Sequence, residues 1–458
     1  MTSELDRLLK GKSILILGYG REGRSTYAFL REQYPGSRLA IADADESLAG
    51  EFAGSDTKAN PALYVGEDYL QACGSYDLVI KTPGIPYEKV RQYCPASVIT
   101  SQTDLFLRAF SEKTIGITGT KGKSTTATLL YHILQSSGRK VILSGNIGIP
   151  PLSLATKVES DTLVVFEMSS HQLEQISIAP KTAVILNIYP EHLDHYKDFT
   201  AYMMAKFNIC HMQAAGGCLV YYGDDPILSE LVRDHPPAGR AITYALNGRP
   251  GLSAFRKGDR IIVNSSGRQQ SIPIDAARDM PGEHNLLNMM AALLVCFEQG
   301  LSAEEVVQGL STYKRLEHRL EYAGTYRGIR FYNDSIATIP QATIHALKTL
   351  DKVDLLILGG YDRGLDYSIL LECLRKDPVG YLVFMGEAGK RMYKSLAGNP
   401  PPGTKMFQVK GMANVFEVVR EKLSTGSVCL LSPAAASYDM FSDFAERGKI
   451  FKKMAAEL

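Results

Sequence analysis

The residues best suited to chemistry form a short stretch rich in glycine and hydroxyl groups, GITGTKGKSTT at residues 116–126. An apolar run enters the stretch and a helical pattern leaves it, which predicts a strand, a tight turn and a helix. Backbone N–H groups in such a turn bind phosphate together with the helix N-terminus. Lys123 would contact the outer phosphates, and the Ser124 hydroxyl would ligate Mg²⁺. The strict pattern has Gly where Ile117 stands, so an ordinary glycine-rich turn is the alternative to a nucleoside triphosphate site.

A second glycine pattern lies near the N-terminus, where Gly18, Gly20 and Gly23 follow an apolar run at residues 13–17. The next predicted strand ends at Asp43, twenty residues after Gly23. This spacing is typical of a dinucleotide-binding turn, whose acidic residue binds a ribose hydroxyl. We expect a Rossmann-like unit here. The pattern leaves open NAD, a nucleotide-sugar, or glycines that serve only close helix–strand packing.

Polar residues also follow predicted strands in the part of the chain that contains the phosphate loop. Glu167 follows the apolar run at 163–166, and Asn187 and His192 follow the run at 184–186. Because the carboxyl ends of parallel strands share one edge of a sheet, we expect these side chains to lie near the loop. A carboxylate, an imidazole and a hydroxyl at that place would hold Mg²⁺–ATP. Taken singly, Glu167 could cap a helix and His192 could be a surface histidine.

The chain is too long, at 458 residues, for a single hydrophobic core. Predicted strands alternate with helical patterns almost throughout, which predicts an α/β protein with mostly parallel sheets. We predict an N-terminal Rossmann-like domain at 1–111, a central mononucleotide-binding domain with the phosphate loop in a parallel sheet at 112–311, and a C-terminal Rossmann-like domain at 312–458. The short alternating runs at 241–274 predict a hairpin-like insert.

The composition limits the classes of function. Hydrophobic residues make up 45% and charged residues 22%, as in an ordinary globular protein. A formal net charge of +1 gives no reason to expect binding to nucleic acid or to an anionic membrane. The first residues are polar and no apolar run approaches about 18 residues, so neither a signal peptide nor membrane insertion is expected. The seven scattered cysteines predict free thiols in a reducing cytoplasm. We expect a cytoplasmic monomer.

A series of spaced motifs resembles the Mur ligases, the ATP-dependent amino-acid ligases of peptidoglycan precursor synthesis. The resemblance spans all three predicted domains. Its motifs are Thr118-Gly119-Thr120 with Gly122-Lys123-Ser124, Gly145-Asn146-Ile147-Gly148, Glu167 with Ser169-Ser170, Asn187 with His192-Leu193-Asp194, Gly282 with His284-Asn285, and His318-Arg319. The segments that resemble the D-glutamate-adding members are Asn333-Asp334-Ser335 with Thr338, the stretch 359–366, and Leu431-Ser432-Pro433-Ala434 with Ser437 and Phe444. Segments of the members that add diaminopimelate, lysine or L-alanine are absent from the sequence.

The resemblance implies ligation of D-glutamate to the alanine carboxylate of UDP-N-acetylmuramoyl-L-alanine through an acyl phosphate, with ATP and two Mg²⁺ ions. The implied catalytic residues are Lys123, Glu167, His192 and Lys206. Ser124 and Glu167 would hold one Mg²⁺, and His192 and a carbamylated Lys206 the second. ATP would contact Gly119, Thr120, Lys121, Gly122, Lys123, Ser124, Thr125, Asn285, Arg319 and Asp334. The UDP-substrate would contact Gly18, Tyr19, Gly20, Arg21, Gly23, Arg24, Asp43, Thr82, Pro83, Gly84, Asn146, Ser169 and Gln172. D-Glutamate would contact His192, Arg363, Ser437 and Phe444.

Two positions depart from the family pattern. Lys121 stands where Asn is usual, and Ile336 stands where a lysine is frequent. For Lys206, the alternative to a carbamate is a solvated lysine on an amphipathic helix. The alternatives for the whole chain are another Mur ligase, a folylpoly-γ-glutamate synthetase, and a non-catalytic nucleotide-sugar sensor. The extra N-terminal Rossmann-like unit opposes the synthetase, and the full set of implied catalytic residues opposes the sensor.

Overall fold

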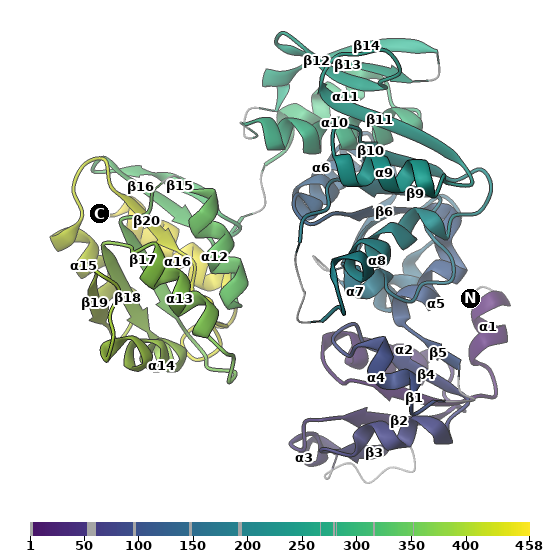
Figure 1. Ribbon diagram of the computed structural model, residues 1–458, viewed down its shortest axis with the longest axis horizontal. Coiled ribbons are helices and arrows are strands. Elements are labelled where there is room, and N and C mark those ends of the chain that lie inside the picture. The colour runs from purple at the N-terminus through teal and green to yellow at the C-terminus, as the bar shows by residue number, and fades with distance from the viewer. Residues whose placement is uncertain are drawn as a thin grey trace. The chain divides into compact units, whose positions relative to one another are not determined.

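The computed structural model divides into two compact units, Met1–Lys314 and Arg315–Leu458 (Figure 1). It describes residues 3–52, 61–94, 98–145, 149–190, 195–265, 267–277, 280, 282–314, 317–350 and 352–458. Two sheets lie in the first unit and one in the second. The predicted α/β class is confirmed. The predicted boundary at residue 111, between the two sheets of the first unit, stays a prediction.

The first sheet contains five parallel strands in the order β3-β2-β1-β4-β5. Its strands are β1 (Ser13–Leu17), β2 (Arg38–Asp43), β3 (Ala62–Val65), β4 (Leu78–Lys81) and β5 (Val98–Thr100). Its helices are α1 (Ser3–Leu9), α2 (Arg21–Gln33), α3 (Leu48–Phe52), η1 (Tyr69–Ser75), α4 (Tyr87–Arg91) and α5 (Gln102–Phe110). The strand order reverses between β1 and β4, and ligands of open α/β sheets bind at the carboxyl ends beside such a point.

The second, central sheet has nine strands in the order β14-β13-β12-β11-β10-β9-β6-β8-β7. Its strands are β6 (Thr114–Thr118), β7 (Val141–Gly145), β8 (Leu163–Glu167), β9 (Thr182–Ile185), β10 (Cys218–Tyr222), β11 (Arg240–Asn247), β12 (Ala254–Lys257), β13 (Arg260–Ser265) and β14 (Arg268–Pro273). Its helices are η2 (Ser111–Lys113), α6 (Lys123–Ser136), η3 (Pro151–Lys157), α7 (Ser170–Leu173), α8 (Phe199–His211), α9 (Pro226–Asp234), η4 (Ile274–Ala276), α10 (Glu283–Glu298) and α11 (Ala303–Thr312).

The region predicted as a hairpin-like insert continues the central sheet. Strands β12, β13 and β14 pair antiparallel as hairpins, but β11 joins β12 in parallel and connects them to the main sheet. The apolar side of these strands packs on α10, and Ile261, Val263 and Ile272 belong to the same core as the phosphate-loop helix. The predicted short strands and hairpins are confirmed, but they extend the central sheet and do not form a separate insert; the alternating pattern does not indicate which neighbour a strand pairs with.

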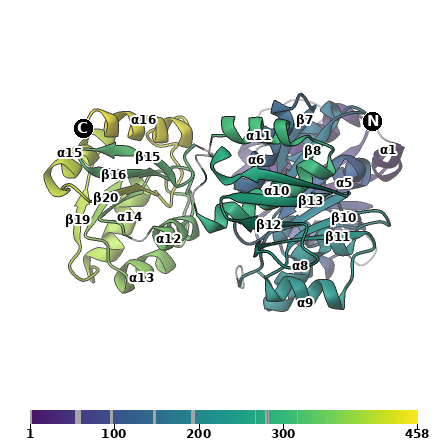
Figure 2. The same ribbon diagram turned by 90° about the horizontal axis from the view of Figure 1, so that it is seen from above.

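Both faces of the central sheet are covered. Helices α6, α10 and α11 pack over one face around a large apolar core (Figure 2). The other face packs on α5, α7 and α8, with Phe106, Phe166 and Tyr202 fully buried. Burial on two sides explains why its strands are continuous apolar runs. It also leaves the carboxyl edge, where the loops lie, as the place for polar side chains.

The second unit contains a six-stranded sheet in the order β15-β16-β20-β17-β18-β19, in which only the pair β15–β16 is antiparallel. Its strands are β15 (Glu321–Tyr326), β16 (Ile329–Asn333), β17 (Leu355–Gly359), β18 (Tyr381–Met385), β19 (Lys405–Gln408) and β20 (Val428–Leu431). Its helices are α12 (Pro340–Thr349), α13 (Ser368–Lys376), α14 (Gly386–Ala397), α15 (Met412–Lys422) and α16 (Phe444–Ala456).

The central strand β17 shows why this sheet is buried on both sides. Leu356 and Leu358 face a core formed with α13 and α14, whereas Leu355 and Ile357 face a core formed with α15 and α16. Alternate residues of a strand point to opposite faces, so an entirely apolar strand requires two apolar layers. Figure 2 shows these helices on opposite sides of the sheet.

All seven cysteines are free thiols, which agrees with the sequence prediction. Six are buried and Cys373 is half-buried. Burial raises the pKa of each thiol, to about 12 for Cys73 and Cys210 and to about 11 for Cys218. Across the part of the chain that the structure describes, no helix is both long enough and apolar enough to cross a bilayer.

Candidate active site

The turn predicted to bind phosphate joins β6 to α6. Gly119 has a φ of +152° and Gly122 a φ of +86°, values that residues with a side chain rarely adopt. A Cβ at Gly122 would lie 2.3 Å from Oδ1 of Asn288, in α10. Backbone conformation and packing therefore both require glycine at this position. The turn brings the N-terminus of the long helix α6 to the predicted phosphate site.

Asn187, predicted as a polar residue at a strand end, holds this turn in place. Its Oδ1 accepts the Lys121 backbone N–H at 2.8 Å, and its Nδ2 donates to the Lys121 carbonyl at 3.0 Å. The Thr120 N–H donates to the Asn187 carbonyl at 2.9 Å. The Asn187 side chain thus provides hydrogen-bond partners for backbone groups of a turn that has no regular secondary-structure hydrogen bonds. Asn187 shapes the turn from the neighbouring strand.

Two lysine side chains converge on the same turn. Lys123 Nζ donates to the carbonyl oxygens of Gly119 at 2.8 Å and of Thr120 at 3.0 Å. Lys206, from α8, donates to the Gly119 oxygen at 2.9 Å. Lys206 is only 2% exposed, and its Nζ lies 5.0 Å from the centre of the Tyr202 ring. This burial rules out the alternative of a solvated lysine at position 206.

Ser124 and Glu167 form the hydroxyl–carboxylate pair expected to ligate Mg²⁺. Ser124 Oγ donates to Glu167 Oε1 at 3.2 Å, and Glu167 is buried at the end of β8. The other carboxylate oxygen, Oε2, accepts no hydrogen bond from the residues that the structure describes. A buried carboxylate oxygen without a donor is costly unless a cation meets it. The pair therefore fits one Mg²⁺ whose remaining ligands are phosphate and water.

The three glycines of the turn in the first sheet have different surroundings. A Cβ at Gly18 would lie 2.0 Å from Thr82 Oγ1, and one at Gly23 would lie 2.0 Å from the Gly18 carbonyl oxygen. These two glycines are required for close packing, which was the alternative left open by the sequence. Gly20 precedes α2, and a Cβ at this position would have no atom within 4 Å. Of the three glycines, Gly20 alone has open space where a Cβ would lie, so it fits the approach of a ligand.

Asp43 orders the same glycine turn. Its Oδ2 accepts the Tyr19 backbone N–H at 2.5 Å, and its Oδ1 accepts the Asp45 N–H at 2.9 Å. Arg24 pairs with Glu51 through two hydrogen bonds and lies 4.7 Å from the centre of the Tyr19 ring. The ribose contact expected of Asp43 stays a prediction, because the carboxylate already has backbone donors.

Ser169 and Gln172 lie at α7, directly after the β8 strand end. Ser169 Oγ accepts the Gln172 N–H at 3.2 Å, and Gln172 Oε1 accepts the Ser169 N–H at 2.9 Å, which forms a capping box. Gln172 Nε2 donates to Glu22 Oε1, in the glycine turn of the first sheet, at 2.8 Å. Both predicted substrate residues therefore also have structural contacts.

Several other predicted residues have simple placements. Asn285 is buried in the first turn of α10, and Thr125 lies in the first turn of α6. Arg21 is exposed at the start of α2, and Pro83 and Gly84 follow β4. Asn146 and His192 lie outside the described residues, so their predicted roles stay predictions.

In the second unit, Asp334 follows β16 and is almost completely buried. Its Oδ2 accepts the Ser432 hydroxyl at 2.7 Å, and its Oδ1 accepts the Leu320 N–H at 3.0 Å. Burial raises the pKa of Asp334 to about 6, against the lowering effect of these donors and of Arg319. A carboxylate at a strand end with such a raised pKa is typical of functional positions.

The remaining predicted residues of the second unit lie in loops beside its sheet or at the start of a helix. Arg319 and Arg363 are exposed, and Arg363 donates to the Thr338 carbonyl at 3.2 Å. Ser437 is buried after β20, and the partly exposed Phe444 begins α16. These positions agree with ligand binding at the carboxyl edge of a parallel sheet.

The structure also shows residues that the sequence reasoning missed. Asn288 packs against Gly122, and the Tyr202 hydroxyl lies 2.9 Å from Thr120 Oγ1. Arg447, in α16, is fully buried and donates to the carbonyls of Ser335 and Ala435. None of these is signalled by a local pattern, because each contact joins segments far apart in the chain.

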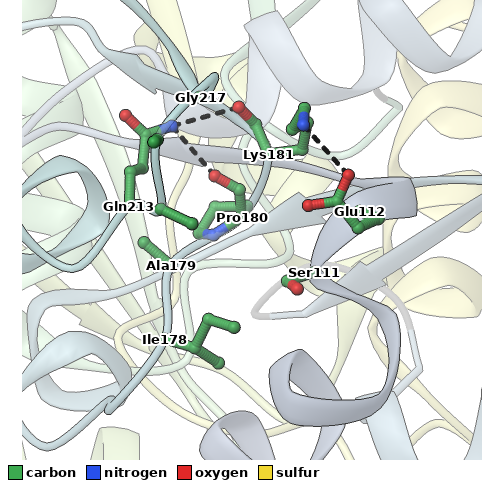
Figure 3. Close-up of a pocket in the computed structure, with 10 residues that line it drawn as sticks. Ser111, Glu112, Ile178, Ala179, Pro180, Lys181, Gln213 and Gly217 are labelled. Carbon is green, nitrogen blue, oxygen red and sulfur yellow. Dashed lines mark hydrogen bonds and ion pairs between the residues drawn. The ribbon is translucent and has the colours of Figure 1, made fainter. Parts of the chain in front are cut away.

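A small cavity lies away from this site (Figure 3). Its volume is about 20 Å³, and Ser111, Pro180 and Gly217 lie beside the amino ends of β6, β9 and β10. Figure 3 shows the Gln213 amide donating to two carbonyls and Lys181 paired with Glu112. A space of this size holds about one water molecule. The cavity is at the opposite edge of the sheet from the phosphate loop and is too small for a substrate.

Residues 117–296 match the Mur ligase middle domain. Over almost its full length, the chain resembles curated proteins named UDP-N-acetylmuramoylalanine–D-glutamate ligase. The protein from Thermoanaerobacter sp. (strain X514) is 32% identical over 454 residues, covering 98% of this chain and 99% of the relative. The chain belongs to the Mur ligase family. The Clostridium kluyveri relative is 30% identical over 462 residues, covering 99% of both chains. The family predicted from the motifs is confirmed.

Solved structures of Mur ligases share the fold. The UDP-N-acetylmuramate–alanine ligase MurC of Thermotoga maritima superposes with a TM-score of 0.51 at 17% identity, covering 97% of this chain and 99% of that one. The MurF ligase of the same organism, solved in complex with ADP, gives a TM-score of 0.51 at 17% identity, covering 100% and 99%. At this identity the likeness supports the fold alone.

The different surroundings of these glycines give a testable contrast between Gly20 and Gly18. We expect Gly20→Ala to change the free energy of unfolding by less than about 0.5 kcal/mol, because its methyl group meets no atom. The same methyl group would occupy the space before α2 and weaken UDP binding at least about tenfold. Gly18→Ala, which clashes with Thr82, should instead destabilise by more than about 2 kcal/mol. Urea unfolding measures the change in stability, and calorimetric titration measures the change in UDP affinity. Unchanged UDP affinity in Gly20→Ala would contradict the proposed approach of the ligand at Gly20.

Buried Asp334 predicts a pH-dependent stability. Its native pKa of about 6 lies above the ordinary 3.8, so the unfolded chain ionises first and the native state becomes less stable as pH rises from about 4 to 6. This loss in the free energy of unfolding reaches roughly 3 kcal/mol above pH 6 and is absent below pH 4. Relative to Asp334→Asn, the wild type should therefore lose about that much between pH 4 and 7. Urea unfolding of both proteins at several pH values measures it. A pH-independent difference would show that Asp334 titrates normally.

Proposed function

We propose that this protein joins D-glutamate to the alanine carboxylate of UDP-N-acetylmuramoyl-L-alanine, with ATP as the phosphoryl donor, in cytoplasmic peptidoglycan precursor synthesis. The observation that carries the proposal is the match to relatives named for this activity over nearly the whole of both chains. The grouping of Lys123, Ser124 and Glu167 at the phosphate loop supports it independently.

The chemistry requires activation of a poor electrophile. The γ-phosphoryl group of ATP passes to the alanine carboxylate, which forms an acyl phosphate and ADP. The amine of D-glutamate attacks the acyl carbon, the carbon–oxygen bond to phosphate breaks, and phosphate and one proton leave. Negative charge gathers near the loop in both steps. The Lys123 ammonium is placed to offset that charge when it turns from the Gly119 and Thr120 carbonyls to phosphate.

Ser124 and Glu167 would hold one Mg²⁺, which supplies charge neutralisation of the phosphates. We propose a second ion at His192 and Lys206. For ATP we propose Gly119, Thr120, Lys121, Gly122, Thr125, Asn285, Arg319 and Asp334. For the UDP-substrate we propose the residues expected from the sequence, with Gly20 as the closest backbone approach. For D-glutamate we propose His192, Arg363, Ser437 and Phe444.

Lys206 is proposed to carry a carbamate. A neutral lysine amine adds CO₂ and releases one proton, which replaces a cation by an anionic oxygen ligand. Burial of Lys206 and the Lys123 ammonium on the same carbonyl both favour the neutral amine that this reaction needs. The carbamate would remove a like-charge pair and provide oxygen ligands for a cation.

Phosphate release tests the function directly. The wild-type protein is assayed with ATP and UDP-N-acetylmuramoyl-L-alanine, and with D-glutamate, L-glutamate, L-alanine or diaminopimelate in turn. The proposed function predicts release that requires both the acceptor and D-glutamate. A second series with a folate acceptor and L-glutamate tests the folylpoly-γ-glutamate synthetase alternative. Release with another amino acid would indicate another Mur ligase, and no release with any acceptor would support the sensor.

Removal of the loop lysine should abolish most of the activity. We expect Lys123→Ala to lower turnover at least about 100-fold, because one preorganised charge contact is worth about that much. The fold should be retained, since the hydrogen bonds from Lys123 Nζ to the Gly119 and Thr120 carbonyls lie within its own turn. Lys140→Ala, which removes a surface lysine paired with Glu159, is the matched control and should keep wild-type turnover. Steady-state kinetics with circular dichroism decide; near-normal turnover in Lys123→Ala would remove the loop from the mechanism.

The carbamate predicts a labelled carbonyl on one lysine. After equilibration with ¹³C-bicarbonate, the wild type should show a carbamate resonance that is absent from Lys206→Ala and Lys206→Arg. Both variants should lose at least about 100-fold in turnover, because arginine keeps the charge but cannot form a carbamate. A fully active Lys206→Arg enzyme, or a resonance that persists in it, would refute the modification.

A further inference from the structure

The short helix α7 and the residue that follows it make two polar contacts with the part of the chain that contains the first sheet. Gln172 Nε2 donates to Glu22 Oε1 at 2.8 Å. Two residues further on, Glu174 Oε2 lies 3.4 Å from Nζ of Lys81, the last residue of β4. Glu22 lies in the first turn of α2, directly after the glycine turn that follows β1, so both strands beside the reversal point of the first sheet lead into contacts with α7 and the residue after it.

Lys81 is a buried charge. Only 3% of its side chain is exposed, although it closes a strand that is otherwise apolar. Burial lowers the pKa of Lys81 below its ordinary value, and attraction to Glu174 and, more weakly, to Glu22 offsets only part of this effect. A buried ammonium persists only with such partners, and loss of one partner leaves an uncompensated charge. The contact between Lys81, at the end of β4, and Glu174, after α7, therefore requires side chains of opposite charge.

The two carboxylates around Lys81 come from helices that belong to different sheets: Glu22 from α2, beside the first sheet, and Glu174 from the end of α7, beside the central sheet. Glu22 is held by the side chains of Gln172 and Gln102, the latter donating to its carbonyl at 3.3 Å. Glu174 also has its other oxygen, Oε1, 3.7 Å from Nε2 of His195. Lys81 thus lies between a group on the first sheet and a group that follows the central strand β8. These three charged residues lie next to segments proposed for the UDP-substrate, but are not among its proposed ligands.

We propose that Lys81, together with Glu22 and Glu174, is a positioning residue for the acceptor substrate. The three side chains set the turn Thr82–Gly84 on the first sheet against Ser169 and Gln172 on the central sheet. A nucleotide-sugar held at the first sheet then presents its far end beside β8, whose last residue is Glu167. This inference rests on the proposed function, since it assumes an acceptor that extends from one sheet to the other.

The arrangement predicts which kinetic constants change. UDP alone would contact the first sheet and would not extend to α7. ATP would contact the loop before α6, whose turn is held by Asn187 and not by Lys81. Loss of the Lys81–Glu174 pair should therefore affect the complete acceptor and spare both nucleotides. A general loss of stability would instead weaken all three ligands together.

The experiment compares Lys81→Met, Glu174→Gln and the double variant by steady-state kinetics and calorimetric titration. We expect kcat/KM for the acceptor to fall roughly 10- to 100-fold in each single variant, in line with the effect of small misplacements. The KM for ATP and the Kd for UDP should stay within about twofold of the wild type. Because the two residues act through one contact, the double variant should be less impaired than the product of the single effects.

Two controls complete the design. Lys181→Met removes the lysine of an exposed lysine–glutamate pair with Glu112, on the opposite edge of the central sheet, and should be neutral. Lys81→Arg keeps the charge and should recover part of the acceptor kcat/KM. If Lys81→Met fails to fold, Glu174→Gln, which preserves shape, decides the question.

The outcomes separate the two levels of inference. A wild-type enzyme without acceptor-dependent phosphate release would overturn the proposed function. An active wild type with unchanged acceptor kcat/KM in Glu174→Gln and Lys81→Met would overturn the positioning role alone. An equal loss toward acceptor, ATP and UDP would also overturn it, because it would show a structural effect only.

Discussion

Two lysine side chains donate to one backbone carbonyl at the phosphate-binding turn, and the rest of the first unit's site is arranged around this contact. Lys123 and Lys206 come from different helices and both reach the Gly119 oxygen. Like charges on a shared acceptor repel each other, the more so where water is scarce. An anion nearby relieves that repulsion, whether it is a triphosphate or a carbamate on one of the lysines. The turn is thus prepared electrostatically for a negatively charged ligand before the ligand arrives.

The surrounding structure keeps that turn from relaxing. Asn187 satisfies its backbone groups, and Asn288 fills the space beside Gly122, where any side chain would clash. The carboxylate of Glu167 lies at the next strand end and retains one oxygen without a donor among the described residues. Positive and negative groups are therefore fixed at one edge of the sheet by packing on both faces. Such preorganisation reduces the rearrangement that charge development would otherwise require.

The sequence predicted those features that a local pattern encodes. Apolar runs indicated the strands, and Glu167 and Asn187 were found as the polar residues that directly follow two of these runs. Lys81 and Glu174 were missed because the two paired residues lie far apart in the sequence, and the only local signal is a charged residue at the end of an apolar strand. The glycine turn shows a second limit. Gly18, Gly20 and Gly23 look alike in the sequence, and only the distance from a methyl group to the nearest atom separates packing from ligand approach. The pairing of β11 with β12 could not be predicted either, because the alternation of apolar and polar residues indicates which side of a strand is buried but not which strand lies beside it.

The burial of the native thiols has a practical consequence. A thiolate is the form that reacts with maleimides; burial raises the pKa of all seven thiols and shields six of them, while Cys373 is half-buried. Six of them contribute apolar volume to the cores, so their removal would leave cavities. A single cysteine introduced at an exposed position should therefore take up a fluorophore selectively while the natural sequence stays intact. The first unit, whose cysteines are all buried, can in this way carry an optical reporter without a cysteine-free background, whereas in the second unit only Cys373 needs replacement.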